Sequence, residues 1–137
     1  MRKVTGLGGI FFTSKDPEAM KKWYSEHLGI VSDKYGTSFE WRQEEDPSQK
    51  GQTAWNIMEE SSSYMEPSFK PFMINYRVDN IEGLVEKLKL DGVTILDQIE
   101  TFDYGKFVHI MDPEGNKIEL WEAKDEAYSA MDNSVTK

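Results

Sequence analysis

Glu119 and His109 are the two residues whose types and positions could support acid–base chemistry together. They lie on either side of the turn-forming segment 112–116, so a hairpin would bring them onto neighbouring strands. A carboxylate beside an imidazole orients the ring and raises its pKa toward neutral pH. Both residues are therefore catalytic candidates, Glu119 as a proton-transfer base and His109 as its partner. The alternatives are a structural histidine and a carboxylate that pairs with Arg77 or Lys106.

Arg77 and Asn75 are the polar candidates for substrate binding. A guanidinium group binds a carboxylate or a phosphonate through two parallel hydrogen bonds, so Arg77 could anchor an anionic substrate. His27 stands near the end of a predicted helix, where a cation favours the helix dipole, and is expected to be structural. Aromatic side chains could complete a small-molecule cleft, with Tyr64 and Phe69 as a lid and a lining of Trp121, Phe107, Trp41, Trp55 and Phe11.

The composition of the 137 residues argues against several classes of function. The sequence contains no cysteine, so disulfides and thiol nucleophiles are excluded and any metal must bind through oxygen or histidine nitrogen. The formal net charge of −9 disfavours nucleic acids and anionic membrane surfaces as partners. The first residues lack the apolar run of a signal peptide, and no stretch approaches the roughly 20 apolar residues of a membrane span. We therefore expect a cytoplasmic protein with a small-molecule ligand.

The first half of the chain has the pattern of a strand, a helix and three further strands. Asp16 is a good N-cap, Pro17 suits the first helical turn, and Gly29 supplies the left-handed residue that ends the helix. A connector rich in serine and proline follows at 60–71 and is long enough to be functional. The expected strands are 8–13, 30–34, 37–43 and 52–58, the last three as an antiparallel meander.

The second half repeats this order. A strand at 72–78 leads to the cap Asn80, to a helix with an apolar stripe over 81–90, and to Gly92 as its stop. The polar tail 124–137 is expected to form a short helix that frays. The strands expected between helix and tail are 94–100, 106–111 and 117–122.

Three segments of the sequence resemble a known family. Residues 8–30, GGIFFTSKDPEAMKKWYSEHLGI, are similar to the opening of vicinal oxygen chelate proteins, where a strand leads through an aspartate into a helix ending in Leu-Gly. Residues 72–93 resemble the start of their second module, and 111–121, MDPEGNKIELW, resemble its closing hairpin. The chain thus resembles the glyoxalase/bleomycin resistance/dioxygenase family. The resemblance implies an α+β fold in which two βαβββ modules form a half-barrel cleft, and it implies a homodimer.

The implied single domain, 1–137, has its first module at 4–59 and its second at 72–123. Alternation within strands selects the residues that face the cleft. Ile118 and Leu120 are expected under a helix, which leaves Glu119 and Trp121 for the cleft. The same alternation gives the other expected cleft residues: Gly9, Phe11, Thr13, Met73, Asn75, Arg77, Phe107 and His109.

The metal site of the family is not expected here. The resemblance implies four ligand positions, which fall on Gly9, Asn56, Met73 and Glu119. Only Glu119 matches, because glycine has no side chain and a thioether is a poor ligand for a hard ion. We therefore expect no cofactor, while a divalent metal at Glu119 remains an alternative.

Two functions follow from the resemblance. One is a glyoxalase-like lyase or isomerase that acts on a small anionic carbonyl compound, with Glu119 as base, His109 as partner and Arg77 as anchor. The other is a non-catalytic, drug-binding protein of the bleomycin-resistance type, which holds an aromatic or cationic compound in an acidic, aromatic cleft.

Overall fold

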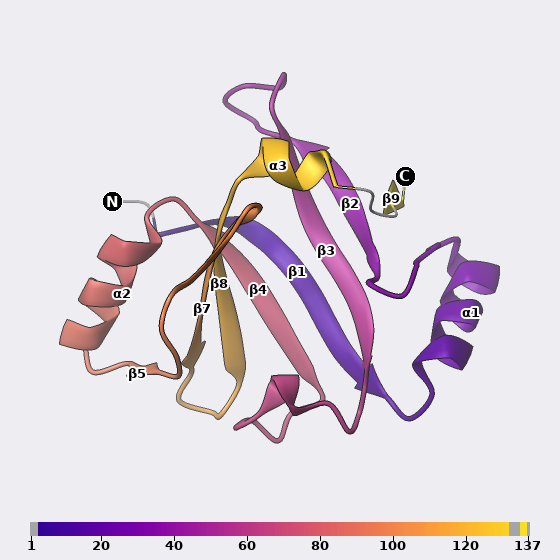
Figure 1. The fold of residues 1–137 in the computed structure, drawn as a ribbon, viewed down its shortest axis with the longest axis horizontal. Helices are drawn as coiled ribbons and strands as arrows, with labels where there is room; N and C mark the ends of the chain where they lie inside the picture. Colours follow the sequence, from indigo (N-terminus) through magenta and orange to yellow (C-terminus); the bar gives the residue numbers. More distant parts are fainter. Residues whose placement is uncertain (1–2, 132–134, 137) are drawn as a thin grey trace.

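The computed structural model describes residues 3–131 and 135–136 and contains one mixed β-sheet (Figure 1). The long strand β1 (Val4–Ser14) lies near its middle, parallel to β3 (Lys50–Glu59) and antiparallel to β4 (Phe72–Val78). The strand order is β5-β7-β8-β4-β1-β3-β2-β9, with β6 also paired to β7. This is the predicted α+β architecture, in which the β1–β4 pair joins the two modules into one sheet.

The first module begins with β1 and α1 (Pro17–Leu28), whose start and end match the sequence signals. The Asp16 side chain accepts a hydrogen bond from Ala19 N at 3.1 Å, and Gly29 is left-handed with a φ of 70°. β2 (Thr37–Arg42) pairs with β3 as the antiparallel hairpin that was expected. The predicted strand at 30–34 is wrong, because this segment contains only an isolated bridge between Asp33 and Gly36, which closes a tight turn.

The second module follows the predicted order more closely. Asn80 caps α2 (Ile81–Leu90) by accepting from Gly83 N at 3.1 Å. The strand predicted at 94–100 is split, because Asp97 leaves the ladder and binds His109 instead. The remaining strands of this module are β5 (Thr94–Ile95), β6 (Glu100–Phe102), β7 (Gly105–Met111) and β8 (Lys117–Ala123).

The apolar core of the second module lies between α2 and the sheet. Ile81, Leu84 and Val85 of α2 pack against Val108 of β7 and Leu120 of β8, all at most 6% exposed. Burial of such side chains contributes about 1.5 to 3 kcal/mol each to folding. The predicted helix-facing residues are therefore confirmed in this module, and alternation turns their neighbours to the opposite face of the sheet.

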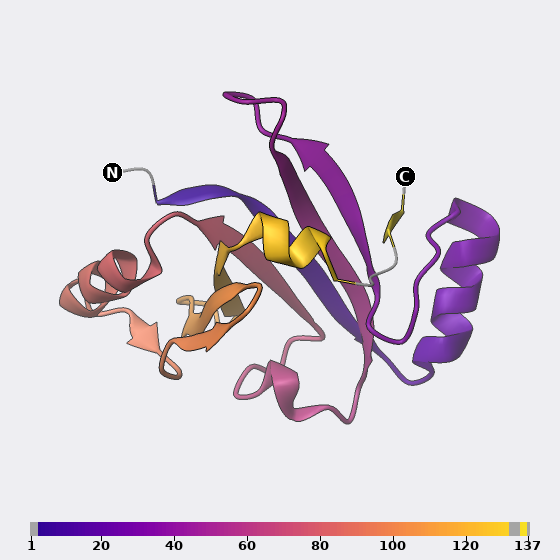
Figure 2. The ribbon, with the colours of Figure 1, turned by 45° about the horizontal axis from the view of Figure 1, so that its top comes forward.

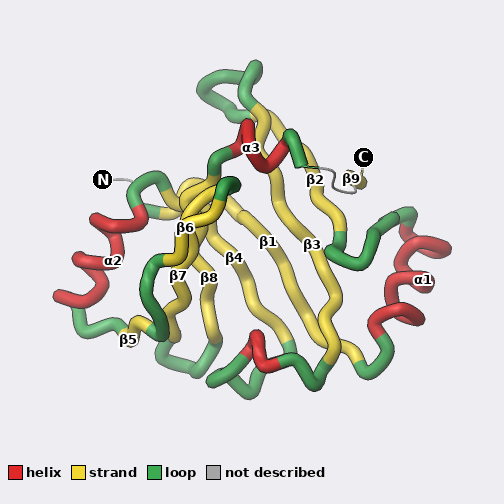
Figure 3. Tube along the Cα trace, in the orientation of Figure 1, coloured by secondary structure: helices red, strands yellow, loops and turns green. Residues whose placement is uncertain are grey.

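Two segments, the connector 60–71 and the tail that follows β8, cover that opposite face at opposite ends of the sheet (Figure 3). The connector 60–71 contains the short 3₁₀ turn Ser63–Met65. The tail forms α3 (Asp125–Ser129), which passes in front of the sheet (Figure 2), and then β9 (Val135–Thr136), which pairs with β2. The predicted short helix of the tail is thus confirmed. Within the described residues, no helix has the length and apolar character needed to cross a membrane.

Candidate functional site

Glu119 is the centre of a buried polar cluster on the face of the sheet opposite α2. It lies on β8, directly beside Asn75 of β4 and His109 of β7 in the strand registers. Asn75 Nδ2 donates to Glu119 Oε1 at 2.7 Å, and His109 Nε2 lies 2.7 Å from Oε2. Glu119 is only 3% exposed. Burial raises the pKa of this carboxyl, but the hydrogen bonds from its neighbours outweigh burial and hold the pKa below its ordinary value.

His109 is held between two carboxylates. Its Nδ1 lies 2.6 Å from Asp97 Oδ2, while its backbone N–H donates to Asp97 Oδ1 at 2.7 Å. Burial lowers the pKa of the imidazole, but the hydrogen bonds to Glu119 and Asp97 outweigh burial and raise it above its ordinary value. Because both ring nitrogens face acceptors, we assign both as donors, which makes the ring an imidazolium. The predicted His109–Glu119 pair is confirmed.

Asp97 was missed by the sequence analysis. It was placed inside a continuous strand, 94–100, although aspartate is depleted in strands. The pair Asp97-Gln98, two polar residues in succession within an expected strand, was the available signal that the strand breaks there.

Tyr64 closes the cluster from the connector. Its hydroxyl donates to Glu119 Oε2, and its ring meets the His109 ring edge-on at 5.5 Å. Burial and the negative charge of Glu119 both raise the pKa of the Tyr64 hydroxyl above its ordinary value. The predicted lid position of Tyr64 is therefore confirmed. The same prediction for Phe69 is wrong, because its side chain is fully exposed, while its neighbour Ser68 turns inward to bond Gly115 O at 2.7 Å.

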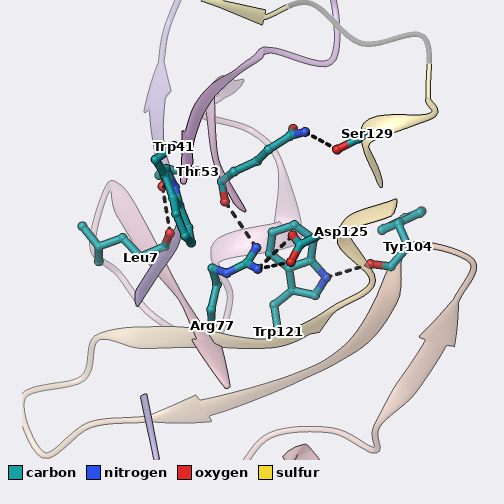
Figure 4. A network of polar contacts seen from close by, with 9 residues as sticks. Leu7, Trp41, Thr53, Arg77, Tyr104, Trp121, Asp125 and Ser129 are labelled. Atoms are coloured by element: carbon teal, nitrogen blue, oxygen red, sulfur yellow. Dashed lines mark hydrogen bonds and ion pairs between the residues drawn. The ribbon is translucent and has the colours of Figure 1, made fainter. Parts of the chain in front are cut away.

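Arg77 is buried, and its guanidinium contacts Asp125 of α3 rather than Glu119 (Figure 4 shows the Asp125 contact). Its Nη2 lies 2.8 and 2.6 Å from the two carboxylate oxygens of Asp125 in α3. The predicted role as a strut for Glu119 is wrong, and the guanidinium is occupied by the tail rather than open to a substrate. Lys106, the other proposed partner of Glu119, pairs instead with Glu82 and Glu122. The alternating pattern of β4 does not indicate that the partner of Arg77 lies beyond the second module.

The aromatic candidates divide between the two faces. Trp121 stacks on Phe107 with ring centroids 5.6 Å apart, on the same face as Glu119, as predicted. Phe11 also faces this side, where its ring occupies the space beside Gly9. The prediction that Trp55 lines the cleft is wrong, because its ring packs against Phe12 and against Tyr24 of α1 on the other face.

The four family ligand positions do not form a metal site. The registers place Gly9 beside Asn75 and place Met73 beside Phe11, so two of the positions present no oxygen or nitrogen donor. Asn56 Oδ1 accepts from Ile57 N at 2.9 Å. Within the part of the chain that the structure describes, no three histidine, aspartate or glutamate side chains converge as ligands. This donor set does not fit a divalent ion.

Comparison with known proteins gives one family and several similar folds. A family model described as Glyoxalase/Bleomycin resistance protein/Dioxygenase superfamily matches residues 6–120. No curated protein matches the chain. Solved structures with a similar fold include a methylmalonyl-CoA epimerase from Mycobacterium tuberculosis, 19% identical over 95% of each chain with a TM-score of 0.58. A variant of the Streptomyces coelicolor methylmalonyl-CoA epimerase is 13% identical, over 88% of this chain and 99% of its own, with a TM-score of 0.63.

Proposed function

Because this chain belongs to the glyoxalase/bleomycin resistance protein/dioxygenase superfamily, we propose that it is a glyoxalase-like enzyme that transfers a proton next to the carbonyl group of a small anionic compound. The family contains several chemistries, so the site must carry the argument. The observation that carries it is the Glu119 carboxyl group, held 2.7 Å from a histidine whose other ring nitrogen contacts Asp97.

Glu119 and His109 divide the work of such a reaction. The Glu119 carboxylate removes a proton from the carbon next to the carbonyl group. His109 Nε2–H then gives up its bond to Glu119 and donates to the resulting enolate oxygen, while Nδ1–H stays bound to Asp97. Glu119 then returns the proton to the neighbouring carbon on the same face of the intermediate, so the product is an isomer. The step is balanced without any oxidant or metal ligand.

Tyr64 marks the place of the substrate. Its hydroxyl is bound to Glu119 Oε2, and Tyr64 is 40% exposed, whereas Asn75 and His109 are at least 92% buried. A ligand that entered from solvent would therefore displace the Tyr64 hydroxyl before it reached Glu119. The neighbours that share this fold include epimerases, and this is consistent with a proton-transfer reaction.

Deuterium incorporation tests the proposal. We expect the protein in D₂O to exchange the carbon-bound hydrogen of at least one member of a panel of small 2-oxo acids and their thioesters, followed by proton NMR. Glu119→Gln is expected to slow this exchange roughly 100- to 10,000-fold. Glu114→Gln, an exposed glutamate of the hairpin turn, is the matched control and should exchange normally. Absence of exchange across the panel, or normal exchange by Glu119→Gln, would refute the proposal.

A second candidate is a non-catalytic binding protein. Both oxygens of Glu119 are already satisfied by protein donors, which leaves the carboxylate without a free position for a reacting proton. Saturable binding of aromatic or cationic compounds by thermal shift, with no exchange of any substrate, would favour this candidate.

The family resemblance also leads us to propose a homodimer. Light scattering during size-exclusion chromatography tests it, and a monomer mass would contradict it.

A further inference from the structure

α3 covers the face of the sheet that carries Glu119, at the end that lies beyond Asn75. Its three polar contacts reach three different strands: Asp125 binds Arg77 of β4, Tyr128 Oη lies 2.6 Å from Ser38 Oγ of β2, and Gln52 Nε2 of β3 donates to Ser129 at 2.8 Å. The Tyr128 ring also packs on Trp121, with centroids 5.2 Å apart. Five helical residues thus cover the face on which Glu119 lies.

Arg77 lies between aromatic side chains, at a cavity whose lining also includes the carboxylates of Glu45, Asp79 and Asp125. Its guanidinium lies between two indoles, 5.0 Å from the Trp41 ring and 5.3 Å from the Trp121 ring (Figure 4). Arg77 is 6% exposed, and its only other polar contact shown by the described residues is a long one, from Nη1 to Gln52 O at 3.5 Å. A guanidinium this far from water requires an anion, and here the anion is the Asp125 carboxylate.

Two cavities are lined in part by residues of α3. One of about 350 Å³ is lined by Trp41, Arg77 and Asp125, among others. The other, of about 370 Å³, is lined by Lys50, Asp125 and Ser129, among others. Asp125 of α3 and Gln49 of the β2–β3 hairpin line both cavities. Each volume alone is at the lower end of the range for small-molecule sites, and displacement of α3 would remove Asp125 from the lining of both.

We propose that Arg77 is the binding site for the carboxylate of a small ligand, and that Asp125 occupies this site in the free protein. α3 is then a displaceable cover whose carboxylate imitates that of the ligand. Arg77 and Asn75 are successive cleft-facing residues of β4, about 7 Å apart along the strand, and Asn75 contacts Glu119. A ligand anchored at Arg77 would reach Glu119 if its carbonyl group lay a few bonds from its carboxylate.

The construction of the tail permits this displacement. α3 has only five residues, and its first-turn amides receive no side-chain cap from Lys124. The strand that follows, β9, pairs with β2 over two residues. A helix this short is not stable by itself, so its position depends on the contacts with Arg77, Ser38 and Gln52.

Because Asp125 is tethered, it competes with any free carboxylate at a high effective concentration. Loss of the Asp125 charge should therefore increase the affinity for a free carboxylate. Asp125→Asn is expected to bind malonate roughly tenfold or more tightly than the unmodified protein, because the binding-competent state becomes more populated. Isothermal titration calorimetry measures both affinities.

Three further variants complete the test. Asp91→Asn removes a carboxylate from the exposed pair with Lys87 and should leave malonate affinity unchanged. Tyr128→Phe loosens α3 without altering Arg77 or Asp125 and should also tighten malonate binding, which keeps the test available if Asp125→Asn does not fold. Arg77→Met combined with Asp125→Asn should abolish the gain. Equal affinity in the unmodified protein and in both α3 variants, or a gain that survives Arg77→Met, would overturn the proposal.

This site deepens the proposed function by naming the substrate class, and it rests on that function only for the reaction at Glu119. Malonate binding requires no turnover. Proton exchange without malonate binding at Arg77 would therefore refute only the proposed carboxylate site. Malonate binding at Arg77 without proton exchange would refute only the proposed enzymatic function.

Discussion

Asn75→Asp would test whether Glu119 is an ionised carboxylate in direct contact with β4. Asn75 donates to Glu119 Oε1 at 2.7 Å, and the two residues are 2% and 3% exposed. The substitution replaces the donor by a second carboxylate of nearly the same shape. Two buried carboxylates at this distance cannot both be ionised, so the folded variant must hold one shared proton.

The size of the effect follows from that proton. An ordinary carboxyl titrates near pH 4, so keeping one proton on the pair at pH 7 costs about 3 pH units, or roughly 4 kcal/mol of the free energy of unfolding. This free energy is not reduced by solvent screening, because both groups are buried. The folded variant binds one proton more than its unfolded chain. Its stability therefore falls as pH rises, by about 1.4 kcal/mol per pH unit relative to the unmodified protein.

Urea unfolding at about pH 5, 6 and 7 measures this difference. The matched control is Asn80→Asp, which makes the same chemical change at the N-cap of α2, where Asn80 accepts from Gly83 N at 3.1 Å. Asparagine and aspartate are equivalent caps, so the control should change stability by less than about 0.5 kcal/mol. A cost for Asn75→Asp that does not vary with pH, or that equals the control, would refute the ionised contact between Asn75 and Glu119.

Two smaller predictions concern the same cluster. Tyr64→Phe removes one donor to a buried carboxylate and should lower the free energy of unfolding by about 1.5 kcal/mol. This is the low end for a hydrogen bond to a charged acceptor, because water can reach this side. The control in urea unfolding is Tyr35→Phe, at a residue that is 74% exposed, and equal losses of stability in the two variants would contradict the Tyr64–Glu119 contact. For the unmodified protein, the lowered pKa of Glu119 contributes stability above its ordinary value of 4.5 that is lost as pH falls through the folded pKa. The raised pKa of His109 contributes stability below its ordinary value of 6.5 that is lost as pH rises through the folded pKa. Urea midpoints should therefore be highest between these two values, and a profile that rises steadily through neutral pH would contradict this assignment.

The local signals of the sequence predicted what local physics determines. Asp16 and Gly29 fixed the ends of α1, and alternation placed Glu119, His109 and Asn75 on one face of the second module. These predictions succeeded because caps depend on a few neighbouring residues and because a strand has a strict two-residue period. Trp55 was placed wrongly in the cleft because a large aromatic residue on a strand suits either face, and only the position of α1 decides between them.

The partners of the site residues were harder to predict, because most lie in irregular segments far along the chain. Asp97 interrupts a strand, Tyr64 belongs to the connector, and Asp125 follows the second module. No periodicity relates such residues to the strands that they contact. Arg77 was therefore assigned to Glu119 of the adjacent strand β8, whereas its actual partner, Asp125, lies in α3 beyond that strand.

The connector and α3 each supply a polar group to a buried charged residue of the sheet. At one end the Tyr64 hydroxyl binds Glu119, and at the other the Asp125 carboxylate binds Arg77. A small carboxylate with a hydroxyl group next to its carbonyl group would present these same two kinds of group, a hydroxyl donor near Glu119 and a carboxylate at Arg77. In the free protein, neither Glu119 nor Arg77 is left as an uncompensated buried charge, which would cost several kcal/mol. Affinity for a ligand would then depend mainly on the free energy needed to move the connector and α3, since the groups that receive the ligand are already in position.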